Sequence, residues 1–309
     1  MDIIFLGTPE FAVPTLERIL AAGHTVPLVV TQPDRPKGRK QELTPSPVKA
    51  AALRHKVPVY QPERIRRPEA VQYLSEFKPD AMVVVGYGQI IPQVVIDMAP
   101  LGIINVHASL LPELRGAGPI QWSIARGFER TGVTTMRINA GLDTGDILLQ
   151  WETPIGENET APELSVRLAE AGADLLVRTL AELLAGQVQP EPQNDTFATY
   201  APIIKKDDGR IDWKDPAHRI HNLIRGLQPW PGAQTSFRGQ SLHLWRSRLV
   251  PQRWDLPPGT LVSERGVFAI GGDGAALELL EVQLEGRKKM MADVFANGHR
   301  LTHADRLGA

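Results

Sequence analysis

The first 188 residues alternate short apolar runs with helix-like segments, and this alternation constrains the fold more than any other feature of the chain. The apolar runs predict strands over 2–6, 25–31, 57–60, 80–85, 102–106 and 132–138. Between and after them, helical patterns cover about 8–22, 46–55, 68–77 and 163–185. A βαβα rhythm of this kind predicts an α/β fold with a doubly wound, mainly parallel sheet of the Rossmann-like type.

The turn after the first strand argues against a dinucleotide site. Gly7 ends the strand, Thr8 suits the N-cap, and Pro9 suits the first position of a helix that runs to about Ala22. The turn carries one glycine where the dinucleotide fingerprint needs three, and the chain contains no Walker sequence. We therefore expect neither a nicotinamide nor an ATP site.

The rest of the chain predicts a second, smaller domain. Residues 187–202 are rich in Pro, Gln, Asn and Thr, which is typical of a linker. We therefore divide the chain into a first domain over 1–188, a linker over 189–204 and a second domain over 205–309. A helix at about 216–226 precedes five short alternating runs, at 234–238, 241–247, 259–263, 267–271 and 276–283. Turn residues separate these runs, as in a small OB-like β-barrel, a fold that often binds nucleic acid.

Charge is divided unevenly between the two predicted domains. Residues 205–309 carry 16 Lys and Arg against 12 Asp and Glu, whereas the remainder carries 18 against 23. A net positive second domain favours a polyanionic partner. In the first domain, the long loop 33–45 holds four cations, at Arg35, Lys37, Arg39 and Lys40. These cations suit either a solvated surface loop or an arm that contacts phosphates.

Asn105 and His107 carry the clearest chemical signal. They stand two residues apart at the end of a predicted strand, so they share one face, and such strand ends border the ligand crevice of an open α/β sheet. Asp143 follows the next strand, between Gly141 and Gly145, in a tight loop that can hold its carboxylate in place. An amide, an imidazole and a carboxylate can together stabilise an oxyanion and move a proton. The group predicts acyl transfer without a protein nucleophile, and the alternative is an ordinary buried histidine.

The composition limits the setting and the chemistry. The chain has no cysteine, which excludes disulfides, thiolate zinc sites and a cysteine nucleophile. Residues 1–7 do not have the basic start and apolar core of a signal peptide, and no apolar run approaches the ~20 residues needed to cross a bilayer. We expect a cytoplasmic protein, and a monomer, because no self-association face stands out.

Several runs resemble the folate-dependent formyltransferases over nearly the whole chain. The catalytic runs of that family are similar to 105–112, 115–121 and 141–146 here. Among its members, those that act on methionyl initiator tRNA have a tRNA-contacting loop similar to 31–39 with 45–49. The C-terminal domain of the same members is similar to this chain at Trp213, 224–225 and 229–231.

The resemblance implies a reaction and roles for individual residues. The formyl donor would be 10-formyltetrahydrofolate, and the acceptor would be the α-amino group of methionine on the initiator tRNA. Asn105, His107 and Asp143 align with the family's catalytic residues, and the family needs no metal. The folate-binding segment aligns with Ser109, Leu110, Leu111 and Pro112. The pterin pocket would be lined by residues 86–90, and Arg39 aligns with the arginine that reaches the acceptor end of the tRNA.

Three alternatives remain open at the level of sequence. A 10-formyltetrahydrofolate hydrolase would use the same site with water as acceptor, but water needs no phosphate-binding arm such as loop 33–45. Glycinamide ribonucleotide formyltransferases share the site but resemble the first domain alone. A tRNA-binding protein without activity would not need Asn105, His107 and Asp143 together.

Overall fold

The structure is a computed structural model that describes residues 1–37, 42–302 and 304–308. The chain forms two compact units, each assembled from three stretches. Unit 1 comprises Met1–Gly116, Thr131–Thr153 and Ser165–Tyr200, and unit 2 comprises Ala117–Arg130, Pro154–Leu164 and Ala201–Ala309. The proposed division into 1–188, 189–204 and 205–309 stays a prediction.

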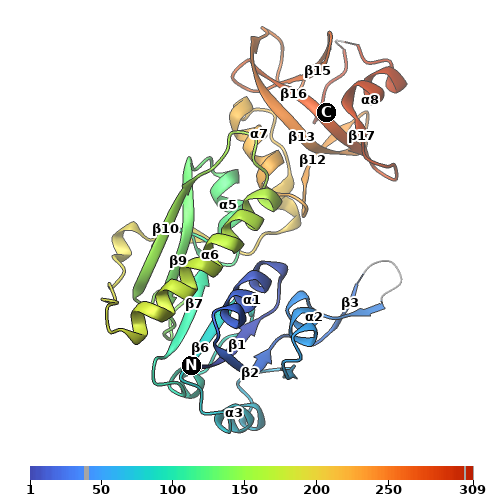
Figure 1. The fold of residues 1–309 in the computed structure, drawn as a ribbon. Helices are drawn as coiled ribbons and strands as arrows, with labels where there is room; N and C mark the ends of the chain where they lie inside the picture. Colours follow the sequence, from blue (N-terminus) through green and yellow to red (C-terminus); the bar gives the residue numbers. More distant parts are fainter. Residues whose placement is uncertain (38–41, 303, 309) are drawn as a thin grey trace. The chain divides into compact units, whose positions relative to one another are not determined.

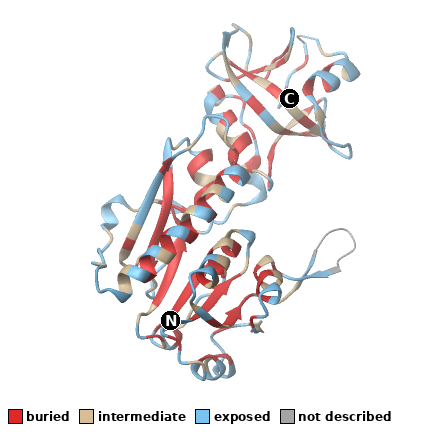
Figure 2. Cartoon of the chain, viewed as in Figure 1, coloured by how far each residue is buried: buried red, intermediate tan, exposed pale blue. Residues whose placement is uncertain are grey.

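Unit 1 is built on a seven-stranded sheet with the order β10-β9-β7-β6-β1-β2-β5 (Figure 1). Its strands are β1 (Asp2–Gly7), β2 (Thr25–Val30), β5 (Val59–Tyr60), β6 (Ala81–Val85), β7 (Ile103–His107), β9 (Arg130–Arg137) and β10 (Ile147–Pro154). The neighbours from β7 to β5 are parallel, whereas β9 is antiparallel to β7. Strands β6 and β7 are buried along their whole length, as Figure 2 shows in red, because helices cover both faces. The predicted α/β fold with a mainly parallel sheet is confirmed.

The helices of this part of the chain lie close to their predicted positions. They are η1 (Glu10–Ala12), α1 (Val13–Ala21), α2 (Pro47–Arg54), α3 (Pro68–Ser75) and α6 (Ala161–Leu184), and the one-turn helix α4 (Gln93–Ile96) was not predicted. Ser46 caps α2 by accepting a hydrogen bond from the Lys49 amide. Gly23 follows α1 with φ at +81°, so the predicted end of this helix is confirmed.

The predicted N-cap at Thr8 is wrong. The chain makes the 3₁₀ turn η1 before α1 begins at Val13, and the Thr8 hydroxyl donates to the Tyr87 carbonyl oxygen at 3.1 Å. The same hydroxyl oxygen accepts from the Gln32 amide at 3.4 Å. Because these three residues follow β1, β2 and β6, Thr8 links the carboxyl ends of three neighbouring strands.

The basic loop is in part a β-hairpin. Strand β3 (Arg35–Lys37) pairs antiparallel with β4 (Glu42–Thr44). At its base, Lys49 lies 2.5 Å from the Asp34 carboxylate, and this hydrogen bond lowers the pKa of Asp34. Arg39 and Lys40, two of the four cations in the loop, lie outside the described residues.

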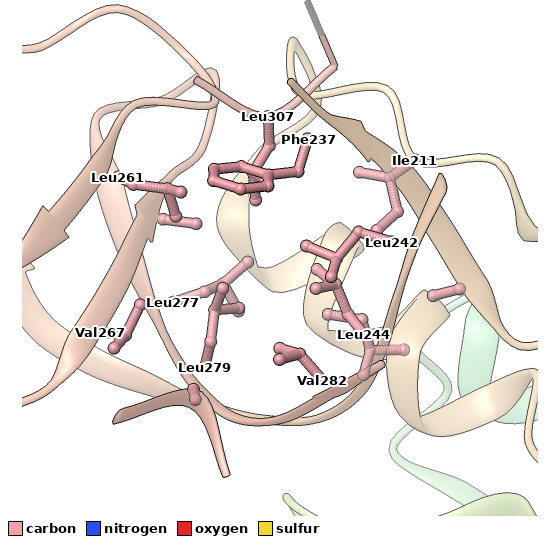
Figure 3. Packing of buried hydrophobic residues seen from close by; sticks show 14 of the residues in the cluster. Ile211, Phe237, Leu242, Leu244, Leu261, Val267, Leu277, Leu279, Val282 and Leu307 are labelled. Carbon is pink, nitrogen blue, oxygen red and sulfur yellow. The ribbon is translucent and has the colours of Figure 1, made fainter. Parts of the chain in front are cut away.

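Unit 2 contains α5 (Pro119–Ala125), α7 (Ala217–Gly226) and an antiparallel sheet with the order β12-β13-β16-β15-β14. The strands are β12 (Ala233–Phe237), β13 (Gln240–Arg253), β14 (Leu261–Ser263), β15 (Val267–Ile270) and β16 (Ala275–Leu284), with β17 (Met290–Met291) paired to β16. The five predicted strands and the helix at 216–226 are confirmed, whereas β17 and α8 (Ala292–His299) were not predicted. Side chains from α7, the sheet and α8 form one buried apolar core, part of which is drawn in Figure 3.

The chain's last residues connect the two edges of this sheet. Leu307 pairs with Phe237 of the edge strand β12, and Arg306 pairs with Thr260, directly before the other edge strand β14. Short elements complete the chain: β8 (Arg115–Gly116), η2 (Asp195–Phe197), β11 (Tyr200–Ala201) and η3 (Lys206–Gly209). Among the described residues, none of the helices is both long and apolar enough to cross a membrane.

Candidate active site

Strand β7 places Asn105 and His107 at its carboxyl end, as the sequence predicts. Both side chains are buried, with exposed fractions of 8 % and 6 %. The Asn105 side chain carries an amide N–H₂, which can donate a hydrogen bond to a substrate oxygen.

The two ring nitrogens of His107 meet different neighbours. Nε2 lies 3.1 Å from the carbonyl oxygen of Leu114. A carbonyl only accepts, so Nε2 carries a proton and donates it to this contact. Nδ1 lies 3.8 Å from Oδ2 of Asp143, within ion-pair distance but longer than a hydrogen bond. Proton exchange at this histidine therefore falls to Nδ1.

Asp143 is held by the backbone around it. Its Oδ2 accepts a hydrogen bond from the Gly116 amide at 2.8 Å, and its φ angle of +51° lies in the left-handed region. A Cβ on Gly145 would lie 1.8 Å from the carbonyl oxygen of Arg137, so the loop passes too close to β9 for any side chain there. The predicted tight loop around Asp143 is confirmed.

The predicted folate-binding segment forms the turn between His107 and Leu114. The Ser109 hydroxyl donates to the Glu113 carbonyl oxygen at 2.6 Å, and Ser109 is only 1 % exposed. Thr134 donates to the Ser109 carbonyl oxygen and accepts from the Leu111 amide. Leu110 and Pro112 are half-buried, so they carry the exposed side of the turn. The Ser109 side chain therefore fixes the shape of the turn.

The turn after β6 supplies a second backbone surface at the same end of the sheet. Gly86 and Gly88 have φ angles of +57° and +80°, and a Cβ on Gly88 would lie 2.6 Å from the Gln32 amide nitrogen. Tyr87 between them is buried, which raises the pKa of its hydroxyl, and that hydroxyl has no hydrogen-bond partner among the residues described.

Two functional groups escaped the sequence analysis because they belong to the backbone. The Leu114 carbonyl sets the proton position on His107, and the Gly116 amide holds the Asp143 carboxylate. Leu114 has a φ angle of +57°, which turns its carbonyl away from a regular path. The Gly-rich run after Leu114 was the only signal for such a bend.

Comparison with known proteins identifies the family. Residues 1–180 match the Formyl transferase family, and residues 203–300 match the Formyl transferase, C-terminal domain family. The chain is 63% identical over 308 residues to the methionyl-tRNA formyltransferase of Solibacter usitatus, covering 100% of this chain and 99% of the relative. It is 56% identical over 310 residues to the enzyme of the same name from Koribacter versatilis, with coverage of 100% and 99%. The chain belongs to the methionyl-tRNA formyltransferases.

A solved structure supports the fold of this family. The N-formyltransferase of Helicobacter canadensis, in complex with folinic acid and dTDP-3-aminofucose, matches with a TM-score of 0.69 at 21% identity. The match covers 90% of this chain and 98% of the other, so it spans both units. The resemblance to folate-dependent formyltransferases is confirmed, and as a methionyl-tRNA formyltransferase the chain is a formyl-transferring enzyme.

Proposed function

We propose that the protein transfers the formyl group of 10-formyltetrahydrofolate to the α-amino group of methionyl initiator tRNA, with Asn105, His107 and Asp143 as its catalytic residues. One observation carries this proposal: a buried histidine whose Nε2 is occupied by a backbone carbonyl while its Nδ1 faces a fixed carboxylate. Full-length identity to methionyl-tRNA formyltransferases supports the choice of substrates.

The chemistry exchanges one carbon–nitrogen bond for another. The neutral amine attacks the formyl carbon, which forms a tetrahedral intermediate with negative charge on the former carbonyl oxygen. The Asn105 amide and the His107 Nδ1–H donate hydrogen bonds to this oxygen. Losing one such donor usually lowers the rate about 10²–10³-fold. Collapse of the intermediate breaks the bond to N10 and leaves the formyl group on the amino acid.

Asp143 makes the proton transfers of this reaction possible. Its carboxylate lies beside Nδ1, where it can balance the positive charge that the ring carries while it transfers a proton. The attacking nitrogen must lose one proton and the departing N10 must gain one, so the proton count balances without an external acid. The 3.8 Å separation of Nδ1 and Oδ2 leaves Nδ1 open to a substrate atom.

The co-substrate and tRNA sites are the finer part of the proposal. Residues Ser109, Leu110, Leu111 and Pro112 form the folate-binding segment. The turn at 86–90 offers backbone groups to the pterin. The Helicobacter canadensis N-formyltransferase, which has a similar fold and was solved with folinic acid, supports the proposal that this protein binds a folate. Arg39 contacts the acceptor end of the tRNA, and the net positive second domain contacts its backbone. We further propose that the protein works as a cytoplasmic monomer.

The experiment that tests the proposal follows release of tetrahydrofolate from 10-formyltetrahydrofolate. Release is expected with methionyl initiator tRNA and not with uncharged initiator tRNA, which has no amino acid to accept the formyl group. Equal release without any tRNA contradicts the proposal and assigns the hydrolase reaction instead. Mass spectrometry of the aminoacyl end then locates the formyl group on the α-amino nitrogen.

A further inference from the structure

Residues Glu191–Thr199, which we call the strap, contact two loops of the candidate site. One loop carries Asp143, and the other carries Leu114, whose carbonyl oxygen contacts His107. The strap falls in the polar stretch predicted as a linker, and it belongs to unit 1. Its first residue is tied to the sheet, because Glu191 and Ile147 exchange backbone hydrogen bonds of 2.8 and 2.9 Å. The contacts that follow involve Gln193 and Thr199.

Gln193 uses its whole side-chain amide on the loop of Asp143. Nε2 donates to the carbonyl oxygens of Asp143 at 2.9 Å and of Gly145 at 2.7 Å. Oε1 accepts from Nε and Nη2 of Arg115 at 3.0 and 2.9 Å. One glutamine therefore fixes the loop backbone at Asp143 itself and two residues after it.

Arg115 orients this glutamine from a buried position. It is 2 % exposed and also donates to the Asp195 carboxylate of the strap at 2.8 Å. The next residue, Gly116, donates its amide to the Asp143 carboxylate. Two consecutive residues therefore hold Asp143. Arg115 acts on its backbone through Gln193, and Gly116 binds its carboxylate directly.

Thr199, at the other end of the strap, fixes the second loop. Its Oγ1 accepts from the Leu114 amide at 2.8 Å, and its carbonyl oxygen accepts from the Arg115 amide at 2.9 Å. The Leu114 carbonyl in turn meets His107 Nε2 at 3.1 Å. Thr199 therefore sets the peptide that orients the imidazole.

We propose that the strap is a positioning element for the formyl-transfer reaction, in which Gln193 positions Asp143 and Thr199 positions His107. Neither side chain needs to touch a substrate. The strap fixes the gap between Nδ1 and Oδ2 by holding the backbone on each side of it. This inference rests on the proposed roles of His107 and Asp143.

The first test replaces Gln193 in the full-length protein. Gln193→Glu keeps an acceptor for Arg115 but removes the donor to the Asp143 and Gly145 carbonyls, and Gln193→Ala removes both. Both variants are expected to lower kcat about 10–100-fold, the usual loss for a residue that orients a functional group, with each KM within about threefold of the parent. The pH profile of kcat should also shift, because the Asp143 carboxylate would no longer be held beside Nδ1 of His107. Gln189→Ala, an exposed glutamine of the same stretch, is the matched control and should behave as the parent.

The second test uses a pair of variants at Thr199. Thr199→Val keeps the shape but removes the acceptor for the Leu114 amide, whereas Thr199→Ser keeps the hydroxyl. We expect a fall in kcat for Thr199→Val and recovery of most of the parent kcat for Thr199→Ser. The inference is wrong if Gln193→Glu and Thr199→Val both keep the kcat and the pH profile of the parent. It is also wrong if these variants change only a KM. If a Gln193 variant does not fold, the Thr199 pair decides the question alone.

Combination with Asp143→Ala separates this inference from the proposed function. If Asp143→Ala retains the parent kcat, the proposed catalytic role fails first. If Asp143→Ala lowers kcat to a small but measurable value while Gln193→Glu and Thr199→Val are fully active, only the inference about the strap fails. If both hold, adding Gln193→Ala to Asp143→Ala should cause no further loss, because residues that act as a unit are not additive.

Discussion

Two histidines of this protein are buried to nearly the same degree, but only one of the two has a carboxylate beside its second ring nitrogen. His107 in unit 1 and His221 in unit 2 are 6 % and 2 % exposed, and each brings Nε2 to within 3.1 Å of a backbone carbonyl. The two rings differ in the group beside Nδ1. For His221 this group is the Ser247 hydroxyl, at 2.9 Å, and for His107 it is the Asp143 carboxylate.

The difference at Nδ1 decides what each ring can do. Burial lowers the pKa of His221, which favours the neutral ring. Since Nε2 donates to the Glu157 carbonyl oxygen, Nδ1 of the neutral ring accepts from the Ser247 hydroxyl. The Asp143 carboxylate has no proton to donate, so Nδ1 of His107 faces an acceptor and not a donor. Both rings are buried and contact a carbonyl, so the carboxylate beside Nδ1 is the feature on which the proposed catalytic role of His107 depends.

Removing the His107 imidazole should have the largest effect. We expect His107→Ala to lower kcat by roughly 10²–10⁴-fold, because the ring supplies both a donor and a proton carrier. Tetrahydrofolate release with methionyl initiator tRNA measures this loss, and circular dichroism checks that the variant is folded. Turnover within threefold of the parent would place His107 in the same class as His221.

Asp143→Asn should turn the surroundings of His107 into a neutral site like that of His221. The Asn oxygen can still accept from the Gly116 amide, so the loop keeps its shape while the charge is lost. A fall in kcat of about 10²-fold is expected, together with a changed pH profile, because the protonated ring loses its partner. The comparison breaks down if Asp143→Asn leaves both kcat and its pH profile as in the parent.

His221→Ala should affect stability and not turnover. It leaves the Glu157 carbonyl and the Ser247 hydroxyl without partners inside unit 2, so the free energy of unfolding should fall by about 1–3 kcal/mol. Urea unfolding measures the loss, and kcat at 25 °C should stay within about twofold. Ser247→Ala serves as a milder companion, with an expected loss of about 1 kcal/mol. A large fall in kcat with unchanged stability would mean that His221 takes part in the reaction.

The smallest expected effect is on the pH dependence of stability. The folded pKa of His221 is below its ordinary value of 6.5, so below pH 6.5 the unfolded chain takes up a proton before the folded protein does. The free energy of unfolding should therefore fall as the pH is lowered from 7.5 to 5, and less steeply in His221→Gln. Burial also lowers the pKa of His24 and His243, but both remain in the variant and cancel in the difference. Parallel curves for the two proteins would contradict this assignment.

The parts of the fold that the sequence predicts are those with a local signal. The apolar runs at β1, β6 and β7 predict a buried parallel sheet, and the spacing of Asn105 and His107 places both on one face. A threonine before a proline suits an N-cap, but the Thr8 hydroxyl instead donates to the carbonyl oxygen of Tyr87, 79 residues away. Nothing local in the sequence reports such a contact.

For the candidate site, likewise, the sequence predicts only the residues whose side chains carry reactive or ionisable groups, such as His107 and Asp143. Gln193 sits in a polar, Pro-rich stretch with the composition of a linker, so its contacts with Asp143 and Arg115 appear only in three dimensions. The Leu114 carbonyl and the Gly116 amide have no side-chain signature at all. The sequence predicts a loop where the hairpin β3–β4 lies, because strands of three residues each are too short to show an alternating pattern.

The left-handed backbone at Asp143 restricts which amino acids selection could place there. Gly adopts this conformation without cost, and Asp and Asn adopt it more readily than most other residues. The proposed role in the reaction, in turn, needs a carboxylate at this position, which leaves Asp and Glu. Aspartate alone belongs to both sets. A library randomised at position 143 should therefore yield Asp, Asn and Gly when screened for folded protein, and aspartate alone when screened for turnover.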